Sequence, residues 1–486
     1  MLFNSYIFLL FLPIVLIGYF LLNRFEKNIY AKCFLIISSL FFYAYNDVRF
    51  GLLMCCSVCI NYLIYYFLIQ REQDSKMRKI GVSFGILFNI LVLCYFKYVD
   101  FFIENINMVL AQSIPLRNVI LPLGISFYTL QQVGFLIDSY KGETGKINAI
   151  DYGVFVTFFP QLVAGPIVSH DEMICQFNDK EKLYVNWSNI ACGLYGFTLG
   201  FAKKVLIADV FGVVVNSYFT IINSLTTMDV IILMLSYTFQ IYFDFSGYCD
   251  MASGIAKMFN ITLPINFNSP YKSYHNLGFW KGWHITLTRF FTKYVYIPLG
   301  GSKKGKLRTY VNVMLVFFIS GFWHGAAWTF VLWGVIHGIA NICTRIFKEQ
   351  LEKCHTVVLW IANFFFINFT WLIFRVESLE QLKIIITRLF TFSFGVNLAT
   401  ILEFKTAELD LFFKITGLIN RIPYYNYIFM IIFVVGAVFI VLNTENVQIK
   451  MQKFKETSFR SIFIAGLLFL CICSLQTVST FLYFNF

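Results

Sequence analysis

Long apolar runs separated by short polar turns make up most of this chain. Each run is close to the roughly 20 residues that an α-helix needs to cross the hydrocarbon of a bilayer. None shows the roughly ten-residue alternation of apolar and polar positions that is typical of an outer-membrane barrel strand. The pattern predicts an all-α polytopic membrane protein, with runs at Tyr6–Leu22, Ala31–Tyr45, Phe50–Ile69, Ile80–Phe96, Val119–Ile137, Ile150–Val168, Ile190–Val215, Val230–Phe245, Val311–Phe347, Val357–Phe374, Tyr427–Leu442 and Ile462–Leu482.

Two of these runs are irregular. Val311–Phe347 is long enough for two spans, and Pro160 and Pro166 interrupt Ile150–Val168, which favours a bent or re-entrant segment. We therefore expect about eleven transmembrane helices, within about two, together with re-entrant or interfacial segments. The first run has no basic segment before it and no A-x-A-like site before Arg24, so we expect it to remain as a helix and not to be cleaved.

The composition agrees with a membrane protein. With 58% hydrophobic and 13% charged residues, a chain of 486 residues has too little polar surface to cover a water-soluble globule. Basic residues gather in short turns such as Arg71–Lys79 and Lys141–Lys146, which favour the cytoplasmic side and predict that both termini lie outside. The net charge of +12 therefore indicates topology and contact with anionic lipid, and no nucleic-acid partner is expected.

The cysteines do not point to redox or metal chemistry. Most of the twelve lie inside apolar runs, where cysteine behaves as a small hydrophobic residue. Cys56 and Cys59 have redox spacing, but no βαβ pattern surrounds them. No second Cys or His pair stands at ligand spacing, so the sequence predicts no metal site.

Polar residues inside the membrane segments divide the chain into three parts of one expected membrane domain, 1–486. Plain apolar helices are expected in 1–118 and further helices in 346–486. In the part 119–345, the predicted spans carry Gly, Pro, Gln, Asp, His, Trp and Lys together. Polar groups at membrane depth are costly unless they face protein or a water-filled cavity, so function is predicted in this central part.

His324 lies in the apolar sequence SGFWHGAAW. A lone histidine on an apolar helix is usually a satisfied core residue, but its neighbours favour a functional role. Gly321 and Gly325 let a substrate or a neighbouring helix approach closely, and Trp323 and Trp328 are expected to wall a pocket. Burial would lower the pKa of the imidazole and keep it neutral, and a neutral imidazole beside a hydroxyl is a general base.

His284 is the second candidate. It lies in the segment Asn276–Arg308, where Trp280 and Trp283 stand at helical spacing beside it. The segment is too charged to cross lipid, so we expect an amphipathic helix at the interface or on a re-entrant path, broken at Pro298. The alternative for His284 is an interfacial ring with its polar tip in water.

The basic stretch after this segment has two possible roles. It is either a topological anchor or a cationic collar for a phosphate-bearing donor or an acidic carrier protein. Its residues are Lys303, Lys304, Lys306 and Arg308.

The remaining polar residues of the core have structural alternatives. Asp244 needs a partner at membrane depth, and pairing with Lys203 or Lys204 is favoured over fixing a histidine tautomer or lining a polar path. Gln161 bonds either the backbone of a broken helix or a substrate. His337 is expected to pack or hydrogen bond between helices, and loop positions are expected for His170, His275 and His355.

Six motifs between Phe159 and Gln381 together carry a family resemblance. They are FPQLVAGPI, DFSGYCDMASGIAKMF, NFNSPY, FWKGWHITLTRFFTKYVYIPLGG, FISGFWHGAAWTFVLWGVIHG and WLIFRVESLEQ. In this order they resemble the membrane-bound O-acyltransferase (MBOAT) family, in its bacterial alginate and peptidoglycan O-acetyltransferase branch. The resemblance implies a helical fold around a central funnel, with the catalytic histidine of the family at His324 and its second functional histidine at His284. The residues expected to line the funnel are Gln161, Asp244, Trp280, Trp283, Trp323 and Trp328.

The resemblance also implies an activity. The expected reaction moves an acetyl group from a cytoplasmic donor, acetyl-CoA or another acyl thioester, toward a polysaccharide hydroxyl outside a bacterial cytoplasmic membrane, with no bound cofactor. Members of this branch usually work with a periplasmic or extracellular partner of serine-hydrolase-like (SGNH-type) fold, and no such domain or nucleophile elbow is evident in this chain. The alternatives are D-alanyl transfer to teichoic acid and, with less support, a transporter or flippase.

Overall fold

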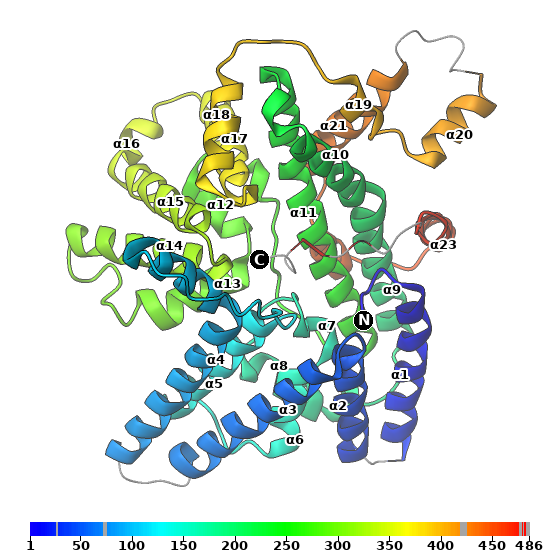
Figure 1. Cartoon of the computed structure of the whole chain (residues 1–486). Helices are drawn as coiled ribbons and strands as arrows, with labels where there is room; N and C mark the ends of the chain where they lie inside the picture. Colours follow the sequence, from blue (N-terminus) through cyan, green and yellow to red (C-terminus); the bar gives the residue numbers. More distant parts are fainter. Residues whose placement is uncertain (26–27, 71–74, 418–424, 476–478, 480, 483–486) are drawn as a thin grey trace. The chain divides into compact units, whose positions relative to one another are not determined.

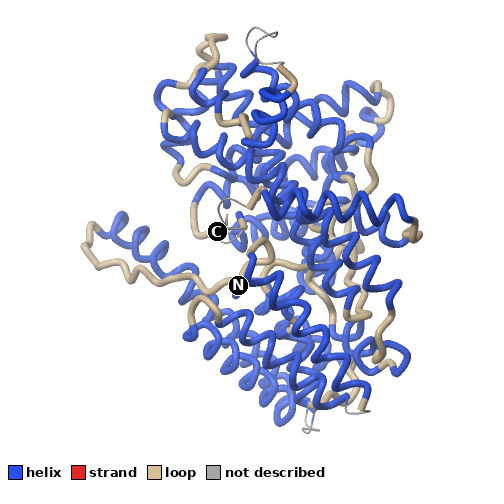
Figure 2. The backbone as a smooth tube through the Cα atoms, turned by 90° about the vertical axis from the view of Figure 1, so that its right-hand side faces the viewer, coloured by secondary structure: helices blue, strands red, loops and turns tan. Residues whose placement is uncertain are grey.

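A computed structural model describes residues 1–25, 28–70, 75–417, 425–475, 479 and 481–482 of the chain. The described residues form helices and connecting segments without a strand among them, so the all-helical prediction is confirmed (Figures 1 and 2). Parts of the basic turn Arg71–Lys79 and of the run Ile462–Leu482 lie outside the described residues.

Several of the described helices are suited to cross a membrane. Seven are long and apolar enough: Tyr6–Arg24, Val48–Gln70, Ser75–Leu110, Thr227–Met258, Trp328–Ile346, Thr356–Arg375 and Asn426–Asn443. Two shorter apolar helices are Asn28–Ala44 and Ser458–Cys473. The chain is therefore a multi-pass membrane protein, while the expected number of about eleven spans stays a prediction.

The helices form two compact units, which are described separately here; the single domain 1–486 with its three parts stays a prediction. Unit 1 contains residues 1–197, 248–265 and 451–457, and unit 2 contains 198–247, 266–450 and 458–486. Unit 1 holds α1 (Tyr6–Arg24), α2 (Asn28–Ala44), α3 (Val48–Leu63), η1 (Ile64–Gln70), α4 (Ser75–Leu110), α5 (Ile125–Lys141), α6 (Ala149–Thr157), α7 (Phe159–Leu162), α8 (His170–Asn178) and η2 (Lys180–Lys182).

The helices of unit 2 follow in chain order. They are η3 (Lys203–Ala208), α10 (Asp209–Thr220), η4 (Ile222–Ser224), η5 (Pro270–Lys272), α12 (Asn276–Gly282), α13 (Ile285–Phe291), η6 (Thr292–Tyr296), α14 (Lys306–His324), α15 (Trp328–Ile346), α16 (Lys348–Leu351), α17 (Thr356–Arg375), α18 (Leu379–Leu389), α19 (Leu398–Leu402), α20 (Ala407–Ile415), α21 (Tyr425–Asn443) and α23 (Ser458–Cys473). Three helices contribute residues to both units: α9 (Trp187–Ala202), α11 (Thr227–Met258) and α22 (Val447–Gln452).

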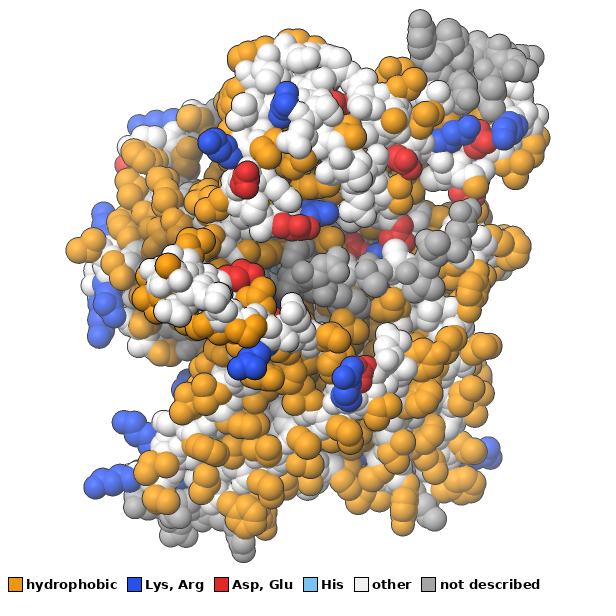
Figure 3. All heavy atoms as spheres, viewed as in Figure 1, with side chains coloured by type: hydrophobic (Ala, Val, Ile, Leu, Met, Phe, Trp, Pro, Cys, Tyr) orange, Lys and Arg blue, Asp and Glu red, His pale blue; other side chains and the backbone are white. Residues whose placement is uncertain are grey.

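The first helices of unit 1 expose many large apolar side chains. Leu10 is 71% exposed, Ile17 68% and Ile37 66%. Figure 3 shows hydrophobic side chains spread over the face that α1 to α5 form in this view. Such an extended apolar surface is unfavourable in water but matches the hydrocarbon of a bilayer, which supports the predicted lipid contact.

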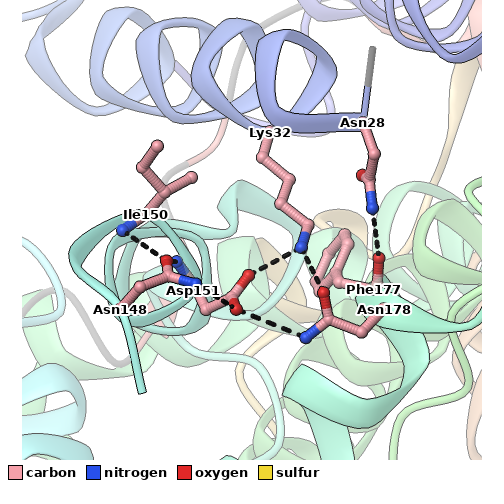
Figure 4. Close-up of polar contacts among 7 residues, drawn as sticks. All are labelled: Asn28, Lys32, Asn148, Ile150, Asp151, Phe177 and Asn178. Atoms are coloured by element: carbon pink, nitrogen blue, oxygen red, sulfur yellow. Dashed lines mark hydrogen bonds and ion pairs between the residues drawn. The ribbon is translucent and has the colours of Figure 1, made fainter. Parts of the chain in front are cut away.

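A buried ion pair joins three helices of unit 1 (Figure 4). The Lys32 ammonium on α2 donates to Asp151 Oδ1 on α6 at 2.6 Å and to Asn178 Oδ1 on α8 at 2.5 Å. Asp151 Oδ2 accepts from Asn148 Nδ2 at 2.8 Å and from Asn178 Nδ2 at 3.3 Å. Lys32 and Asp151 are each other's charged partner, so removing one charge would leave the other buried without an opposite charge.

The run with two prolines is broken as predicted. Helix α6 ends at Thr157, and the four-residue helix α7 follows with Pro160 in its first turn, where proline costs no hydrogen bond. Gln161 is 2% exposed and donates through Nε2 to the carbonyl of Phe155 at 2.8 Å. Gln161 therefore bonds the backbone of the broken helix, which is the first of its two alternatives.

One loop expectation in unit 1 is wrong. His170 is the first residue of α8, and its buried ring lies with Nδ1 3.7 Å from Asp138 Oδ2 on α5. The sequence reading missed this helix start because the polar stretch after Val168 looks like a surface loop. His275 and His355 are the residues directly before α12 and α17, where each ring accepts a backbone N–H.

Helices α14 and α15 of unit 2 form a tightly packed hairpin, so the run Val311–Phe347 holds two helices. Of the two, α15 is among the helices apolar enough to cross a membrane, and two spans in this run stay a prediction. A Cβ on Gly321 would lie 3.0 Å from the Cα of Gly334, and one on Gly334 would lie 3.1 Å from the Cα of Gly321. The neighbouring helix therefore occupies the space beside Gly321. His324 is the last residue of α14, at the turn between the two helices.

The segment Asn276–Arg308 breaks earlier than predicted. The expected helix through His284 is interrupted at Trp283, where α12 has ended and α13 has not begun. His284 has φ 46° and ψ 53°, a left-handed conformation that a residue with a Cβ adopts only at a cost of about 1–2 kcal/mol. Helical spacing of the aromatic residues hid this break, because nothing in the local sequence marks a left-handed histidine.

Candidate active site

His324 lies in an aromatic cage in unit 2. Its side chain is buried, with 4% of the residue exposed. The ring stands edge-on to Trp323 at 4.9 Å, to Trp333 at 5.3 Å and to Phe374 of α17 at 5.3 Å between ring centroids. Aromatic walls of this kind exclude water and hold an imidazole in place while offering it few competing polar groups.

His284 is held by the asparagine of the NFNSPY motif. Asn266 is fully buried, and its Oδ1 lies 3.1 Å from His284 Nδ1. The same oxygen accepts from the backbone N–H of Thr286 at 3.2 Å and from the Thr286 hydroxyl at 2.8 Å. The backbone carbonyl of Asn266 accepts from the N–H of Ile285 at 2.9 Å. The backbone oxygen and the side-chain oxygen of Asn266 therefore both bind the strained turn.

The turn at His284 also requires close backbone packing. The N–H of Asn268 donates to the Gly282 carbonyl at 2.8 Å, and a Cβ on Gly282 would lie only 2.7 Å from the Asn268 carbonyl oxygen. The segment after α11 therefore runs against the chain that carries His284. His284 lies outside the candidate spans, and burial lowers the pKa of its imidazole from 6.5 to about 3, so it is neutral near neutral pH.

Trp323 lies next to both histidines. Its ring centroid lies 4.9 Å from that of His324 and 6.5 Å from that of His284. The Phe245 ring of α11 also lies near His284, edge-on at 4.9 Å between centroids. The structure therefore brings the two candidate histidines to one indole, which the sequence, with 39 intervening residues, does not show.

The predicted funnel tryptophans have different surroundings. Trp280, Trp283 and Trp323 are buried in the aromatic cluster of unit 2, whereas Trp328 is 53% exposed. Trp283 contacts Trp371 of α17 at 4.7 Å between centroids. Trp328 is thus more exposed than the other three, and the roles of all four tryptophans as lining residues stay predictions.

Asp244 forms the expected ion pair with Lys204. The Lys204 ammonium lies 2.6 Å from Asp244 Oδ1 and 2.8 Å from Asp209 Oδ1. Asp244 Oδ2 accepts the backbone N–H of Leu482 at 2.7 Å. Lys204 belongs to η3, a π-helical turn between α9 and α10, and such turns often occur at functional sites. The pairing gives Asp244 a structural partner, while its place along a substrate path stays a prediction.

The basic collar is solvent-accessible. Lys303, Lys304, Lys306 and Arg308 are all exposed, in the glycine-rich turn after η6 and the first turn of α14. Gly305 has φ 87°, a conformation that favours glycine at the start of this helix. The cations are therefore free to meet an anionic partner, and whether they bind the donor stays a prediction.

His337 is a hydrogen-bonded residue of the helix core, as predicted. Its Nδ1 accepts from Trp280 Nε1 at 3.3 Å and lies 3.2 Å from Asn276 Nδ2. Its Nε2 lies 3.1 Å from the hydroxyl oxygen of Thr370, whose proton goes to the Ile367 carbonyl. Both nitrogens of His337 are therefore used in packing α12, α15 and α17 together.

The structure adds two residues that the sequence reading did not select. Asn266 binds His284, and Trp333 faces His324 with its ring fully buried. The Trp333 indole N–H has no acceptor among the described residues. Both positions lie in quoted motifs, NFNSPY and WGVIHG, but only the folded arrangement relates them to a histidine.

This site can now be compared with known proteins. The family model of the membrane-bound O-acyltransferases, MBOAT, matches residues 40–381, which include both histidines and Asn266. The chain belongs to the MBOAT family. It is 38% identical to the peptidoglycan O-acetyltransferase of Helicobacter pylori, over 100% of this chain and 98% of that protein.

Other relatives share less of their length with this MBOAT chain. The probable alginate O-acetylase AlgI of Pseudomonas aeruginosa is 34% identical over 88% of this chain and 82% of its own. The teichoic acid D-alanyltransferase of Bacillus subtilis is 27% identical over 54% of this chain and 70% of its own. Family membership makes this chain an O-acyltransferase.

Proposed function

We propose that this MBOAT transfers an acetyl group from a cytoplasmic acyl thioester, acetyl-CoA or a related donor, for O-acetylation of an extracytoplasmic polysaccharide such as peptidoglycan or alginate. The proposed location is the cytoplasmic membrane of a bacterium. The observation that carries the proposal is the pair of buried imidazoles, His284 and His324, that both lie next to Trp323. The acetyl-transferring relatives support the acyl group and the class of acceptor.

The proposed chemistry assigns His324 the role of general base. A hydroxyl oxygen attacks the thioester carbonyl carbon, its proton passes to His324, and the carbon–sulfur bond breaks to release the thiolate, which takes the proton from the imidazolium. An ester and a free thiol result, so atoms and charges balance. General-base assistance of this kind contributes about 10²–10⁴ in rate.

The tetrahedral intermediate also needs donors for its oxyanion. The Trp333 N–H fits this role, because it is buried beside His324 and has no acceptor among the described residues. A buried donor without an acceptor costs about 1–3 kcal/mol of stability. A buried donor stabilises a developing negative charge more strongly than a donor in water does.

Two further groups complete the proposal. The collar of Lys303, Lys304, Lys306 and Arg308 would attract the phosphates of CoA or an acidic carrier protein. An extracytoplasmic SGNH-type transferase would pass the acetyl group to the polymer, since the G-x-S-x-G match of this chain, Gly81–Gly85, lies inside helix α4 and not at a strand-to-helix turn. D-alanyl transfer is the second candidate, but the D-alanyltransferase relative is less similar and covers only about half of this chain.

Inverted membrane vesicles from cells that make the full chain test the proposal, because they present the cytoplasmic face to added donor. We expect labelled acetyl-CoA to release free CoA and to leave alkali-labile label on polysaccharide, at rates that depend on the chain. D-alanyl label without acetyl label would favour the second candidate. Movement of a polymer precursor without CoA release would contradict acyl transfer and favour a transporter.

A further inference from the structure

The hydrogen bonds around Asn266 determine which atom of the His284 ring carries its proton. The backbone N–H of Thr286 can only donate, so the Asn266 atom that it contacts at 3.2 Å must be the carbonyl oxygen. That oxygen has no proton to give, and His284 Nδ1 lies 3.1 Å from it. Nδ1 must therefore be the donor in this contact.

A neutral imidazole with its proton on Nδ1 carries its lone pair on Nε2. Burial keeps the His284 ring neutral, and the left-handed turn at His284 fixes its direction through two backbone bonds to Asn266. In this form, Nε2 can accept a hydrogen bond but cannot donate one to an oxyanion.

We infer that Asn266 is a positioning residue that holds His284 in its Nδ1–H tautomer, so that His284 acts in the proposed acyl transfer as a hydrogen-bond acceptor for a substrate donor other than the attacking hydroxyl, whose proton passes to His324. The inference rests on the proposed function for the substrate. The tautomer itself rests only on the contacts of Asn266.

This inference separates the roles of the site. An Nε2 lone pair excludes His284 as a donor to the oxyanion, which is left to donors such as the Trp333 N–H, while His324 takes the proton of the attacking hydroxyl. A residue that sets the tautomer of a catalytic histidine typically changes the rate strongly without touching the substrate.

NMR on the full chain with ¹⁵N-labelled histidine tests the tautomer without any activity. The chain contains six histidines, and a His284→Gln variant identifies the His284 signals by their loss. We expect wild-type His284 to show a protonated Nδ1 and an unprotonated Nε2. A protonated Nε2 with an unprotonated Nδ1 would overturn the inference.

Three variants test whether Asn266 causes the preference. Asn266→Leu keeps the volume but removes the acceptor, so Nε2–H should become populated. Thr286→Val is the matched control, since it removes one bond to Asn266 Oδ1 and leaves the Nδ1 contact in place. Asn266→Asp keeps an acceptor if the leucine variant does not fold, and it should retain the Nδ1–H form. An unchanged tautomer in Asn266→Leu would contradict the role of Asn266.

Rates in inverted vesicles then connect the tautomer to catalysis. Asn266→Leu should lower kcat by about 10²-fold with an unchanged KM for acetyl-CoA, at the lower end of what a positioned acid–base group contributes. In Asn266→Asp, the new carboxylate favours the imidazolium and raises the pKa of His284, so activity should fail at a higher pH than in wild type as the solution is acidified.

The two failures are distinguishable. Absence of acetyl transfer in wild type would overturn the proposed function, whereas the NMR result would still decide the tautomer. Full activity in Asn266→Leu after a proven loss of the Nδ1–H form would overturn the catalytic part of this inference alone.

Discussion

Two buried imidazoles of unit 2, His337 and His284, carry their protons on opposite ring nitrogens. His337 accepts at Nδ1 from the Trp280 indole and donates at Nε2 to Thr370, so both of its nitrogens join neighbouring helices. His284 donates at Nδ1 to Asn266 and keeps its lone pair on Nε2. Burial alone therefore does not indicate catalysis; the partners of each ring nitrogen do.

The buried lysines and the candidate catalytic histidines also differ in their surroundings. Lys32 in unit 1 and Lys204 in unit 2 are buried cations, and each is paired with a carboxylate. The candidate catalytic rings are instead surrounded by aromatic side chains, with His324 against Trp323, Trp333 and Phe374 as the clearest case. An imidazole that must take up a proton during the reaction is best held neutral beforehand.

Substituting His284 and His337 separately should give the largest difference in acetyl-transfer rate. His284→Ala should lower acetyl transfer by about 10²–10⁴-fold at equal membrane abundance, because a positioned hydrogen-bond acceptor for the substrate is lost. His337→Leu should instead lower stability by about 1–3 kcal/mol for each buried group left without a partner, while the rate per folded molecule stays near wild type. Initial rates in vesicles and thermal unfolding in detergent measure both. Catalytic loss without destabilisation in His337→Leu would break the comparison.

Removing a buried cation should act on stability. Lys204→Met leaves Asp244 and Asp209 without their shared partner and should cost about 3–5 kcal/mol, as should Lys32→Met in unit 1. Lys32→Met combined with Asp151→Leu should recover much of the loss, since both charges are then absent. Thermal unfolding of the purified variants is the measurement, and an unchanged midpoint for Lys204→Met would show that this pair is not structural.

Two tryptophans test the oxyanion donor. Trp333→Phe keeps an aromatic ring beside His324 but removes the N–H, and it should lower kcat by about 10²–10³-fold with little change in KM. Trp371→Phe is the matched control, because its N–H is already bonded to the Tyr271 hydroxyl at 3.0 Å. Equal rates for the two variants would exclude Trp333 as the donor.

The smallest effect is expected at the collar. Changing Lys303 and Lys304 to glutamine should raise the KM for acetyl-CoA severalfold and leave kcat unchanged, because exposed cations attract the donor without touching the reacting atoms. The difference from wild type should shrink as salt is added, since screening weakens exposed charges. A fall in kcat at saturating donor would contradict this role.

Much of the fold was predictable because apolar periodicity and length report directly on helices in lipid. The ion pair of Asp244 followed from the cost of a lone carboxylate, and the packing role of His337 from its helical setting. The break at His284 and its contact with Asn266 were not predictable, because a left-handed residue is fixed by tertiary bonds that local spacing does not contain. The exposure of Trp328 shows the same limit, since the apolar residues around it in the sequence do not determine how much of its side chain the fold buries.

The most direct test of the account measures the ester-linked acetyl content of cell-wall polysaccharide in cells that lack the native gene and express either wild type or His324→Ala. Mild alkali releases these acetyl groups for quantification, and immunoblotting of membranes establishes equal abundance. We expect wild type to restore acetylation and His324→Ala to leave it at the level of the deletion. Near wild-type acetylation with His324→Ala would contradict the assignment of the general base.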